Sequence, residues 1–269
     1  MSSVAVQQYN APFDAVANVY DNDFENNIVT QHLRSLIWKE SLNRFKPGQH
    51  ILELNCGTGT DAIFFAKQGI NVTALDASSE MITVAKSKVL QTSFDPSSLN
   101  FLHLKNESLN QLQGNLYDGI FSNFGGLNCT PDLNSVIQSW LPLLKPNSYI
   151  VLCFLNKIYP WEIFSQLFRG RIRQAFRRFS NQGTVAQLGK SSIRVWYYTP
   201  AEISQILSPQ YTIENIFGIN IVSPNPTSQR FISHNVELTK SLLSVDDVIQ
   251  SSPLFYGLGD HFIVTARLK

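Results

Sequence analysis

The stretch ILELNCGTGT, residues 51–60, decides the fold, because an apolar strand-like run passes directly into a loop of small residues. Its spacing matches an E-x-G-x-G-x-G loop that begins at Glu53, with Asn55 in place of the first glycine. Gly57 and Gly59 carry no side chains, so backbone there can lie against a ligand. Asparagine readily adopts positive φ, and we therefore expect Asn55 to make the turn.

Around this loop, short apolar runs alternate with amphipathic helical stretches, which is typical of an α/β sheet covered by helices. Two late runs, 212–222 and 261–268, have no strong helix of the βαβ type between them, so we expect them to pair antiparallel. The predicted fold is a doubly wound mixed sheet, mostly parallel with an antiparallel last strand. The earlier strands are expected at 50–55, 71–76, 100–105, 117–123 and 149–155.

The same alternation sets the expected organisation of the chain, because it stops near residue 156 and resumes at the run 192–198. A helix start is expected at Thr130, with Pro131 at the first helical position, and a capping box at Thr199. The predicted parts are an N-terminal helical part (1–44), a core (45–155), a cap insertion (156–193), the continued core (194–222), a second helical insertion (223–258) and the last core strand (259–269).

Composition and charge narrow the possible partners. Charged residues make up 15% of the chain and its net charge is +1, so no global field favours nucleic acid or an anionic membrane, although a local patch could. The first ten residues lack a signal-peptide pattern, and the longest apolar run is too short to span a bilayer. We expect a cytoplasmic chain with small-molecule partners, without nucleic acid or integral membrane association. The oligomeric state stays open.

Cysteines and arginines raise two further questions about sites. Cys56, Cys129 and Cys153 show no C-x-x-C spacing, so we expect no disulfide framework and no metal site. Five arginines lie within residues 169–178, and on a helix Arg169, Arg173 and Arg177 would share one face. A solvated amphipathic cap helix is the favoured interpretation. Recognition of an acidic substrate, contact with a membrane surface and RNA binding stay open.

Four polar or small-residue features fall at the carboxyl ends of predicted strands, where open α/β sheets bind ligands. They are the loop after Glu53, Asp76, the segment 105–107 and the segment 122–128. Asp76 follows Gly59 by 17 residues, close to the spacing at which an acid binds ribose hydroxyls. The loop also fits the G-x-G-x-x-A pattern of a dinucleotide dehydrogenase. A carboxylate at Glu53 would repel the pyrophosphate of a dinucleotide and could orient a cationic ligand. Glu53 therefore favours a cationic ligand over a dinucleotide.

Together these ordered motifs resemble the class I S-adenosylmethionine-dependent methyltransferases over about residues 13–155. The loop ELNCGTG is similar to the family's first motif, YDGIFSNFGGLN to its fourth-strand motif, and LLKPNSYIVLCFL to its fifth-strand turn and strand. The resemblance implies a Rossmann-like fold and S-adenosylmethionine as cofactor, with no metal. It also implies that residues 1–44 form a helical lid and that residues 45–155 form the cofactor-binding core. The cofactor residues that it implies are Tyr20, Glu53, Asn55, Gly57, Gly59, Asp76, Ala77, Met81, Asn106, Asn123 and Phe124.

Within this resemblance, Glu53 and the glycine loop hold the methionine part and Asp76 takes the ribose hydroxyls. Ala77 and Met81 flank the adenine, and Asn106 stands where the family usually has Asp. Tyr20 resembles a lid tyrosine that closes over the methionine end, and it is one of our two catalytic candidates; His234 is the other, as a base.

The expected acceptor is an aromatic or carboxylate-bearing small molecule, methylated on oxygen or nitrogen rather than carbon. Our candidate substrate-binding residues are Asn128, Arg171, Arg194 and Tyr197. A non-catalytic cofactor-binding or scaffold protein and an NAD-type dehydrogenase stay as alternatives.

Overall fold

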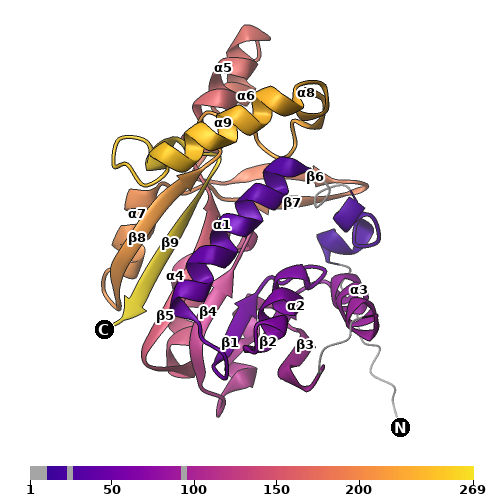
Figure 1. Ribbon diagram of the computed structural model, residues 1–269, viewed down its shortest axis with the longest axis vertical. Helices are drawn as coiled ribbons and strands as arrows, with labels where there is room; N and C mark the ends of the chain where they lie inside the picture. The colour runs from indigo at the N-terminus through magenta and orange to yellow at the C-terminus, as the bar shows by residue number, and fades with distance from the viewer. Residues whose placement is uncertain (1–10, 23–26, 92–95) are drawn as a thin grey trace.

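The protein, seen here as a computed structural model that describes residues 11–22, 27–91 and 96–269, is built on a seven-stranded sheet (Figure 1). The strand order is β3-β2-β1-β4-β5-β9-β8, with parallel pairing from β3 to β5. The strands are β1 His50–Leu54, β2 Asn71–Asp76, β3 Leu99–His103, β4 Tyr117–Ser122, β5 Leu144–Leu155, β8 Tyr211–Ile219 and β9 His261–Leu268.

The central strands are apolar on both faces because helices cover the sheet on both sides. In β5, Ile150 and Leu152 pack into one buried cluster, and Val151 and Cys153 pack into the cluster on the opposite face. Helices α1 (Ile28–Arg44), α2 (Thr60–Lys67) and α3 (Ser79–Leu90) cover one face. Helices α4 (Leu133–Trp140) and α7 (Pro200–Leu207) cover the other.

The predicted mixed sheet is confirmed. Strand β9 runs antiparallel to both of its neighbours, β5 and β8, so it lies inside the sheet and β8 forms the edge. The first six residues of β9 are buried, as expected for a strand covered on both faces. This arrangement leaves the carboxyl ends of β1 to β5 together at one edge of the sheet.

Two local expectations differ from the structure. Helix α4 begins at Leu133 instead of Pro131, because the side chain of Asp132 accepts a hydrogen bond from the backbone N–H of Ser135 and caps the helix. The strand at the start of the continued core, β7 (Ser191–Val195), pairs with β6 (Thr184–Leu188) in a separate two-stranded ribbon. Ile193 and Val195 of β7 face the cavity described below while Arg194 is exposed, so this alternation belongs to a covering ribbon.

The arginine-rich stretch is also not one helix. Helix α5 (Pro160–Phe168) ends before Gly170, whose φ of 68° lies in the left-handed region that breaks a right-handed helix. Helix α6 (Ile172–Ala175) and the 3-10 turn η7 (Arg177–Phe179) follow as short separate pieces. The arginines therefore point to different surroundings, and Arg178 is buried.

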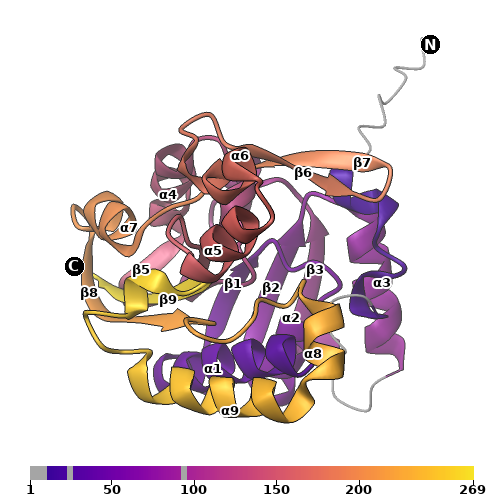
Figure 2. The same cartoon turned by 90° about the horizontal axis from the view of Figure 1, so that it is seen from above.

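The late helices and the short 3-10 segments complete the fold. Helix α9 (Val236–Ile249) lies alongside α1, and Leu243 packs with Val29 and with Ile232 of α8 (Gln229–His234) (Figure 2). None of the helices within the described ranges is long and apolar enough to cross a bilayer. The remaining 3-10 segments are η1 Pro12–Ala15, η3 Pro96–Ser98, η4 Asn106–Leu112, η5 Gly126–Cys129, η6 Leu141–Leu143 and η8 Tyr256–Leu258.

Candidate active site

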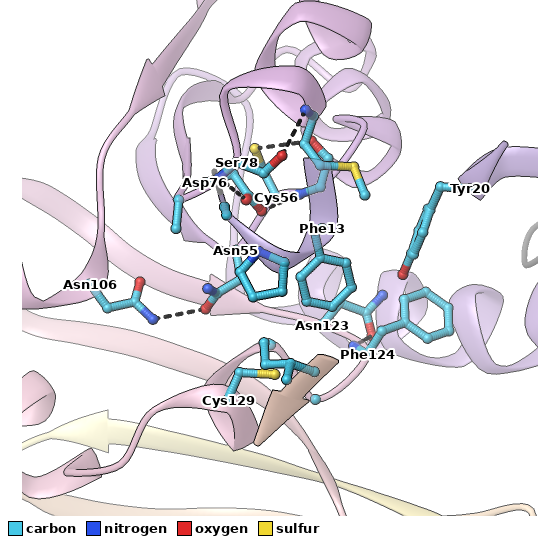
Figure 3. Close-up of a pocket in the computed structure, with 18 of the residues that line it drawn as sticks. Phe13, Tyr20, Asn55, Cys56, Asp76, Ser78, Asn106, Asn123, Phe124 and Cys129 are labelled. Atoms are coloured by element: carbon cyan, nitrogen blue, oxygen red, sulfur yellow. Dashed lines mark hydrogen bonds between the residues drawn. The ribbon is translucent and has the colours of Figure 1, made fainter. Parts of the chain in front are cut away.

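A cavity of about 380 Å³ lies at the carboxyl ends of β1, β2 and β4 (Figure 3). The segment around η1 lies over one side, and the β6–β7 ribbon closes another. Side chains and backbone from five regions far apart in sequence line it: residues 11–20, 55–61, 76–81, 105–107 and 123–130, with Leu155 and the ribbon adding an apolar wall.

The loop after β1 contains a left-handed turn at each of its three key positions. Asn55 has a φ of 58°, so asparagine makes the turn where the E-x-G-x-G-x-G pattern has glycine. Gly57 has a φ of 52°, and a Cβ there would meet no atom within 4 Å, because the position faces the open cavity. Gly59 has a different role: a Cβ would come within 2.7 Å of the Phe101 ring and 2.9 Å of Ala85. Gly59 does not line the cavity.

Asp76 at the end of β2 fastens the loop to the neighbouring strand. Its carboxylate accepts hydrogen bonds from the backbone N–H groups of Gly57, at 2.9 Å, and Ser78, at 2.8 Å. Burial raises the pKa of this carboxyl, and the two backbone hydrogen bonds act in the opposite direction. Each oxygen has a second lone pair, so Asp76 can still accept hydrogen bonds from a ligand in the cavity.

Asn106 has its amide orientation fixed by two neighbours. Its Nδ2 donates to Oδ1 of Asn55 at 3.0 Å (Figure 3). The same Nδ2 donates to Oγ1 of Thr130 at 3.4 Å. Its Oδ1 is buried and has no hydrogen-bond partner among the described residues, which leaves an acceptor for a ligand N–H. Ala77 and Met81 line the same side of the cavity.

The loop after β4 is held by Asp61 of α2. Asn123 donates from Nδ2 to Asp61 at 3.0 Å, and its Oδ1 accepts the backbone N–H of Phe124 at 2.7 Å. Trp38 of α1 donates to the same carboxylate at 2.7 Å. Phe124 has a φ of 48°, a rare conformation for a bulky residue, and its ring lies 4.9 Å from the Arg34 guanidinium carbon. These contacts fix the ring of Phe124 at the cavity.

The N-terminal segment is fastened over the cavity by two acidic residues. Asp14 accepts a hydrogen bond of 2.5 Å from the hydroxyl of Ser78, and Asp21 accepts one of 2.5 Å from Thr58. Lys88 of α3 reaches Asp21 at 2.7 Å. Tyr20 lies between these two anchors and lines the cavity, with its ring 6.4 Å from that of Phe13 in an edge-to-face arrangement (Figure 3).

Glu53 ends β1 beneath the loop, with 2% of its surface exposed, and is not one of the residues that line the cavity. Burial, with repulsion from the nearby carboxylates of Asp61 and Asp76, raises its pKa well above the usual value for Glu. Its Oε2 atom has no hydrogen-bond partner within the described parts of the chain. A positively charged ligand above the loop would favour the ionised carboxylate.

Our candidates for acceptor binding lie elsewhere. Asn128 is fully buried, and its amide group bonds to the backbone of Leu155 and Trp196, so it braces the cavity wall from behind. Tyr197 is buried beside Arg178, whose guanidinium carbon lies 4.9 Å from its ring centroid.

Arg171, Arg194 and His234 are exposed and are not residues that line the cavity. Arg194 donates to the backbone carbonyl of Gln182 at 2.8 Å. His234 lies on α8, where its Nδ1 atom is 2.8 Å from the carbonyl oxygen of Arg230. Alternation along β7 points Arg194 outward while its neighbours Ile193 and Val195 face the cavity.

Several lining residues went unrecognised in the sequence. Arg34 and Asp61 sit on helices with no motif of their own. The apolar wall consists of Leu155, Ala186, Leu188, Ile193 and Val195. The alternation of Ile193 and Val195 with polar residues was a usable signal for a one-sided ribbon, but sequence alone does not say which ligand site such a ribbon covers.

The thiols at the cavity are not poised as nucleophiles. Burial raises the pKa of Cys129 to about 12 and that of Cys56 well above its usual range, so both are protonated at neutral pH. Among the residues described, no group of three His, Cys, Asp or Glu side chains is arranged to hold a metal ion.

Comparison with known proteins gives matches over the part of the chain that contains the glycine loop, Asp76 and the loop after β4. Residues 51–147 match the profile of a family described as "Methyltransferase domain". A curated relative, the ubiquinone biosynthesis O-methyltransferase of Pectobacterium carotovorum subsp. carotovorum, is 29% identical over 110 residues. That match spans 41% of this chain and 44% of the relative, so less than half of either chain is aligned.

Solved structures match nearly the whole fold. The N-methyltransferase NodS from Bradyrhizobium japonicum, in complex with S-adenosyl-l-homocysteine, has a TM-score of 0.57 at 11% identity, with 96% of this chain and 98% of NodS covered. The [4+2]-cyclase SpnF has a TM-score of 0.59 at 14% identity, with 95% and 93% covered. The second likeness shows that this fold also hosts other reactions.

The profile match begins inside β1 and ends in the turn within β5, so it covers the glycine loop, Asp76 and the loop after β4. The fold of nearly the whole chain is similar to that of NodS, since the TM-score of 0.57 is reached over 96% of this chain. The chain is thus similar to the class I S-adenosylmethionine-dependent methyltransferases, by the profile over residues 51–147 and by the fold over nearly its whole length.

Proposed function

We propose that this protein binds S-adenosylmethionine at the carboxyl edge of the sheet and transfers its methyl group to a small acceptor molecule. One observation carries the proposal: the turn at Asn55 to Gly57, Asp76 and Asn106 open into one cavity, whose far wall is apolar. A volume of about 380 Å³ falls in the range of small-molecule sites. The same cavity thus offers polar groups for a cofactor and an apolar surface for an acceptor.

The residues present fit the cofactor. The buried Oδ1 atom of Asn106, which has no partner in the described structure, can accept from the adenine amino group. Asp76 can accept from the ribose hydroxyls, and Ala77 and Met81 can flank the base. The bare backbone at Gly57 can lie against the methionine part, while Glu53 supplies negative charge beneath the loop. Gly59 lets the loop pack closely against Phe101 and Ala85 and does not contact the cofactor itself.

When bound, S-adenosylmethionine supplies a methyl group already activated by the positive charge on its sulfur. The protein's task is then to orient an acceptor atom in line with that methyl and to exclude water. Phe13, Tyr20 and Phe124 close the cavity near the glycine loop, and the anchors of Asp14 and Asp21 hold this closure in place. Tyr20 is thus proposed to orient the methyl group, more than to transfer protons.

The acceptor is proposed to be a largely apolar molecule that presents an oxygen or a nitrogen. The wall formed by Leu155 and the β6–β7 ribbon favours apolar contact. The carboxylates of Asp61 and Asp76 are engaged in hydrogen bonds, and His234 lies outside the cavity lining. An amine or an already ionised oxygen would suit this site, because neither needs a strong side-chain base. The ubiquinone relative, an O-methyltransferase, and NodS, an N-methyltransferase, leave both atoms open.

Isothermal titration calorimetry tests the cofactor. We expect S-adenosylmethionine and S-adenosylhomocysteine to bind, and NAD to bind at least 100-fold more weakly, about 2.7 kcal/mol. Tight NAD binding without binding of either sulfur compound would overturn the proposal.

Methyl transfer itself needs a second measurement, because the likeness to SpnF shows that the fold alone does not fix the reaction. The protein is incubated with methyl-labelled S-adenosylmethionine and fractionated cell metabolites, and labelled products are identified by mass spectrometry. A labelled small molecule that depends on the protein supports the proposal. Cofactor binding without any labelled product would favour a scaffold or another reaction on the same fold.

A further inference from the structure

The chain's near-neutral charge conceals a strong separation of charge along the sequence. The span 163–201 holds seven of the 21 Lys and Arg residues and none of the 20 Asp and Glu residues, so it carries a formal charge of +7. The rest of the chain, with 14 basic and 20 acidic residues, carries −6. The span 163–201 is thus basic and the rest of the chain acidic, and such a pattern orients a molecule in an external field.

Large apolar side chains are exposed in the same span. Phe164, Leu167 and Phe168 of α5 lie three and four positions apart, so they share one helix face, and Phe168 is 92% exposed. Ile172 at the start of α6 is 65% exposed, and Phe176 is 49% exposed. Helix α5 forms the end of the molecule along its longest axis, with α6 beside it (Figure 1). These side chains therefore stand at a protruding tip.

Internal pairing accounts for only part of the basic charge. Arg177 and Arg178 bind the buried carboxylate of Glu162, and Arg178 also binds Asp260. Arg169, Arg171 and Arg173 are instead exposed, interleaved in sequence with the exposed Phe168 and Ile172. We define the tip surface as Phe164, Leu167, Phe168, Arg169, Arg171, Ile172 and Arg173.

We propose that the tip surface docks on an anionic lipid bilayer. Aromatic and aliphatic side chains can enter the boundary between headgroups and acyl chains while arginines pair with lipid phosphates. A second copy of the chain is disfavoured as occupant, because two such tips would repel each other. The acidic remainder of the chain is repelled by the same bilayer, so the molecule is held with its tip toward the membrane.

The whole 269-residue chain is tested by co-sedimentation with vesicles of phosphatidylcholine that contain about 30% phosphatidylglycerol, and with vesicles of phosphatidylcholine alone. We expect binding to the anionic vesicles, at least about tenfold weaker binding to neutral ones, and release by salt. The single variants Arg171→Gln and Arg173→Gln should each bind anionic vesicles about fivefold more weakly, the equivalent of about 1 kcal/mol. Phe168→Ser should weaken it about tenfold.

Matched controls separate the tip surface from general effects. Leu90 and Leu254, which are 88% and 79% exposed elsewhere, are changed to Ser, and the exposed Lys39 is changed to Gln. These variants should bind vesicles like the unmodified protein, and thermal melts should show that all variants fold. Equal losses in the tip and control variants would overturn the proposal.

Two other results would also overturn it. The first is a lack of sedimentation with anionic vesicles at low salt. The second is a dimer in analytical ultracentrifugation that Phe168→Ser abolishes while vesicles fail to bind, because the tip would then contact a second copy. Vesicle binding needs neither cofactor nor methyl transfer, so its failure leaves the proposed function untouched.

Discussion

The edge that carries the glycine loop and the cap that covers it reach their geometry by different means. At the edge, the decisive features are local: positive φ at Asn55 and Gly57, and a carboxylate at Asp76 that takes two backbone N–H groups. In the cap, position depends on residues distant in sequence, because Arg178 joins Glu162 of α5 to Asp260 before β9. Local rules make the edge recognisable in sequence, and long-range contacts make the cap specific to this chain.

The largest expected effect is in the cap. Arg178→Met removes one partner of a buried network in which the guanidinium bonds to Glu162, to Asp260 and to the carbonyl of Asn156. Leaving buried carboxylates unpaired costs about 3–5 kcal/mol. We expect the midpoint of thermal unfolding to fall by about 6–15 °C.

The control for this change is Arg173→Met, an exposed arginine of the same cap, which should shift the midpoint by less than about 2 °C. Folded Arg178→Met protein should still bind S-adenosylmethionine within about tenfold of the unmodified affinity, since the edge does not use this network. If Arg178→Met and Arg173→Met lowered the midpoint of thermal unfolding equally, the buried network of Arg178 would not be what holds the cap in place.

The same network has an expected pH dependence. Burial acts to raise the pKa of Asp260, but the nearby Arg178 and His261 outweigh it and hold that pKa well below the usual range. The ionised pair therefore contributes its full stability above the unfolded pKa of about 3.9 and loses it as the pH falls further. Acid titration of thermal stability should show the unmodified protein approaching Arg178→Met only below about pH 4.

The second prediction addresses the loop. Gly57→Val should weaken S-adenosylmethionine binding at least about 100-fold, or about 2.7 kcal/mol, because the side chain would enter the cavity at a positive φ. Asn55→Gly keeps the turn but loses the acceptor for Asn106, so its loss should stay below about tenfold. Calorimetry measures both affinities, and similar losses would show that Asn55 contacts the ligand directly.

The third prediction concerns the acid after β2. Asp76→Ala should weaken cofactor binding about 10- to 100-fold, because hydrogen bonds to a charged group contribute about 1.5–3 kcal/mol. Asp247→Ala, which removes an exposed acid far along the chain on α9, serves as control. Unchanged affinity in Asp76→Ala would mean that the ribose is held by other residues.

How far sequence could predict the molecule follows the same division. Strands, their mixed pairing, the turn at Asn55 and the convergence of Asp76 and Asn106 depend on periodicity and local backbone preference, so they could be predicted. The start of α4 was misplaced by two residues, since Pro131 at a first helical position and Asp132 as a cap are competing signals there.

The acceptor side could not be predicted in the same way. Arg171 and Arg194 suggested carboxylate binding by residue type, but which way each points depends on Gly170 and on the pairing of β7 with β6. We expected Asn128 to contact a ligand because it follows a strand end. Its amide nitrogen instead donates hydrogen bonds to the backbone carbonyl oxygens of Leu155 and Trp196. The orientation of each of these side chains depends on its local backbone and on contacts with residues far away in the sequence, and a single sequence does not reveal those contacts.

The last prediction has the smallest effect and joins stability to binding at the edge. Glu53 has a raised pKa because it is buried near Asp61 and Asp76, so its ionisation costs stability as the pH rises through that pKa. Glu53→Gln should therefore raise the melting midpoint of the cofactor-free protein by about 2–4 °C at pH 8, about 1 kcal/mol, and by less at pH 5. The same change should weaken S-adenosylmethionine binding about fivefold, because it removes the negative charge beneath a cationic ligand. A variant that gains no more stability at pH 8 than at pH 5, yet binds the cofactor as tightly as before, would mean that the pKa of Glu53 is not raised by folding and that its charge plays no part in holding the cofactor.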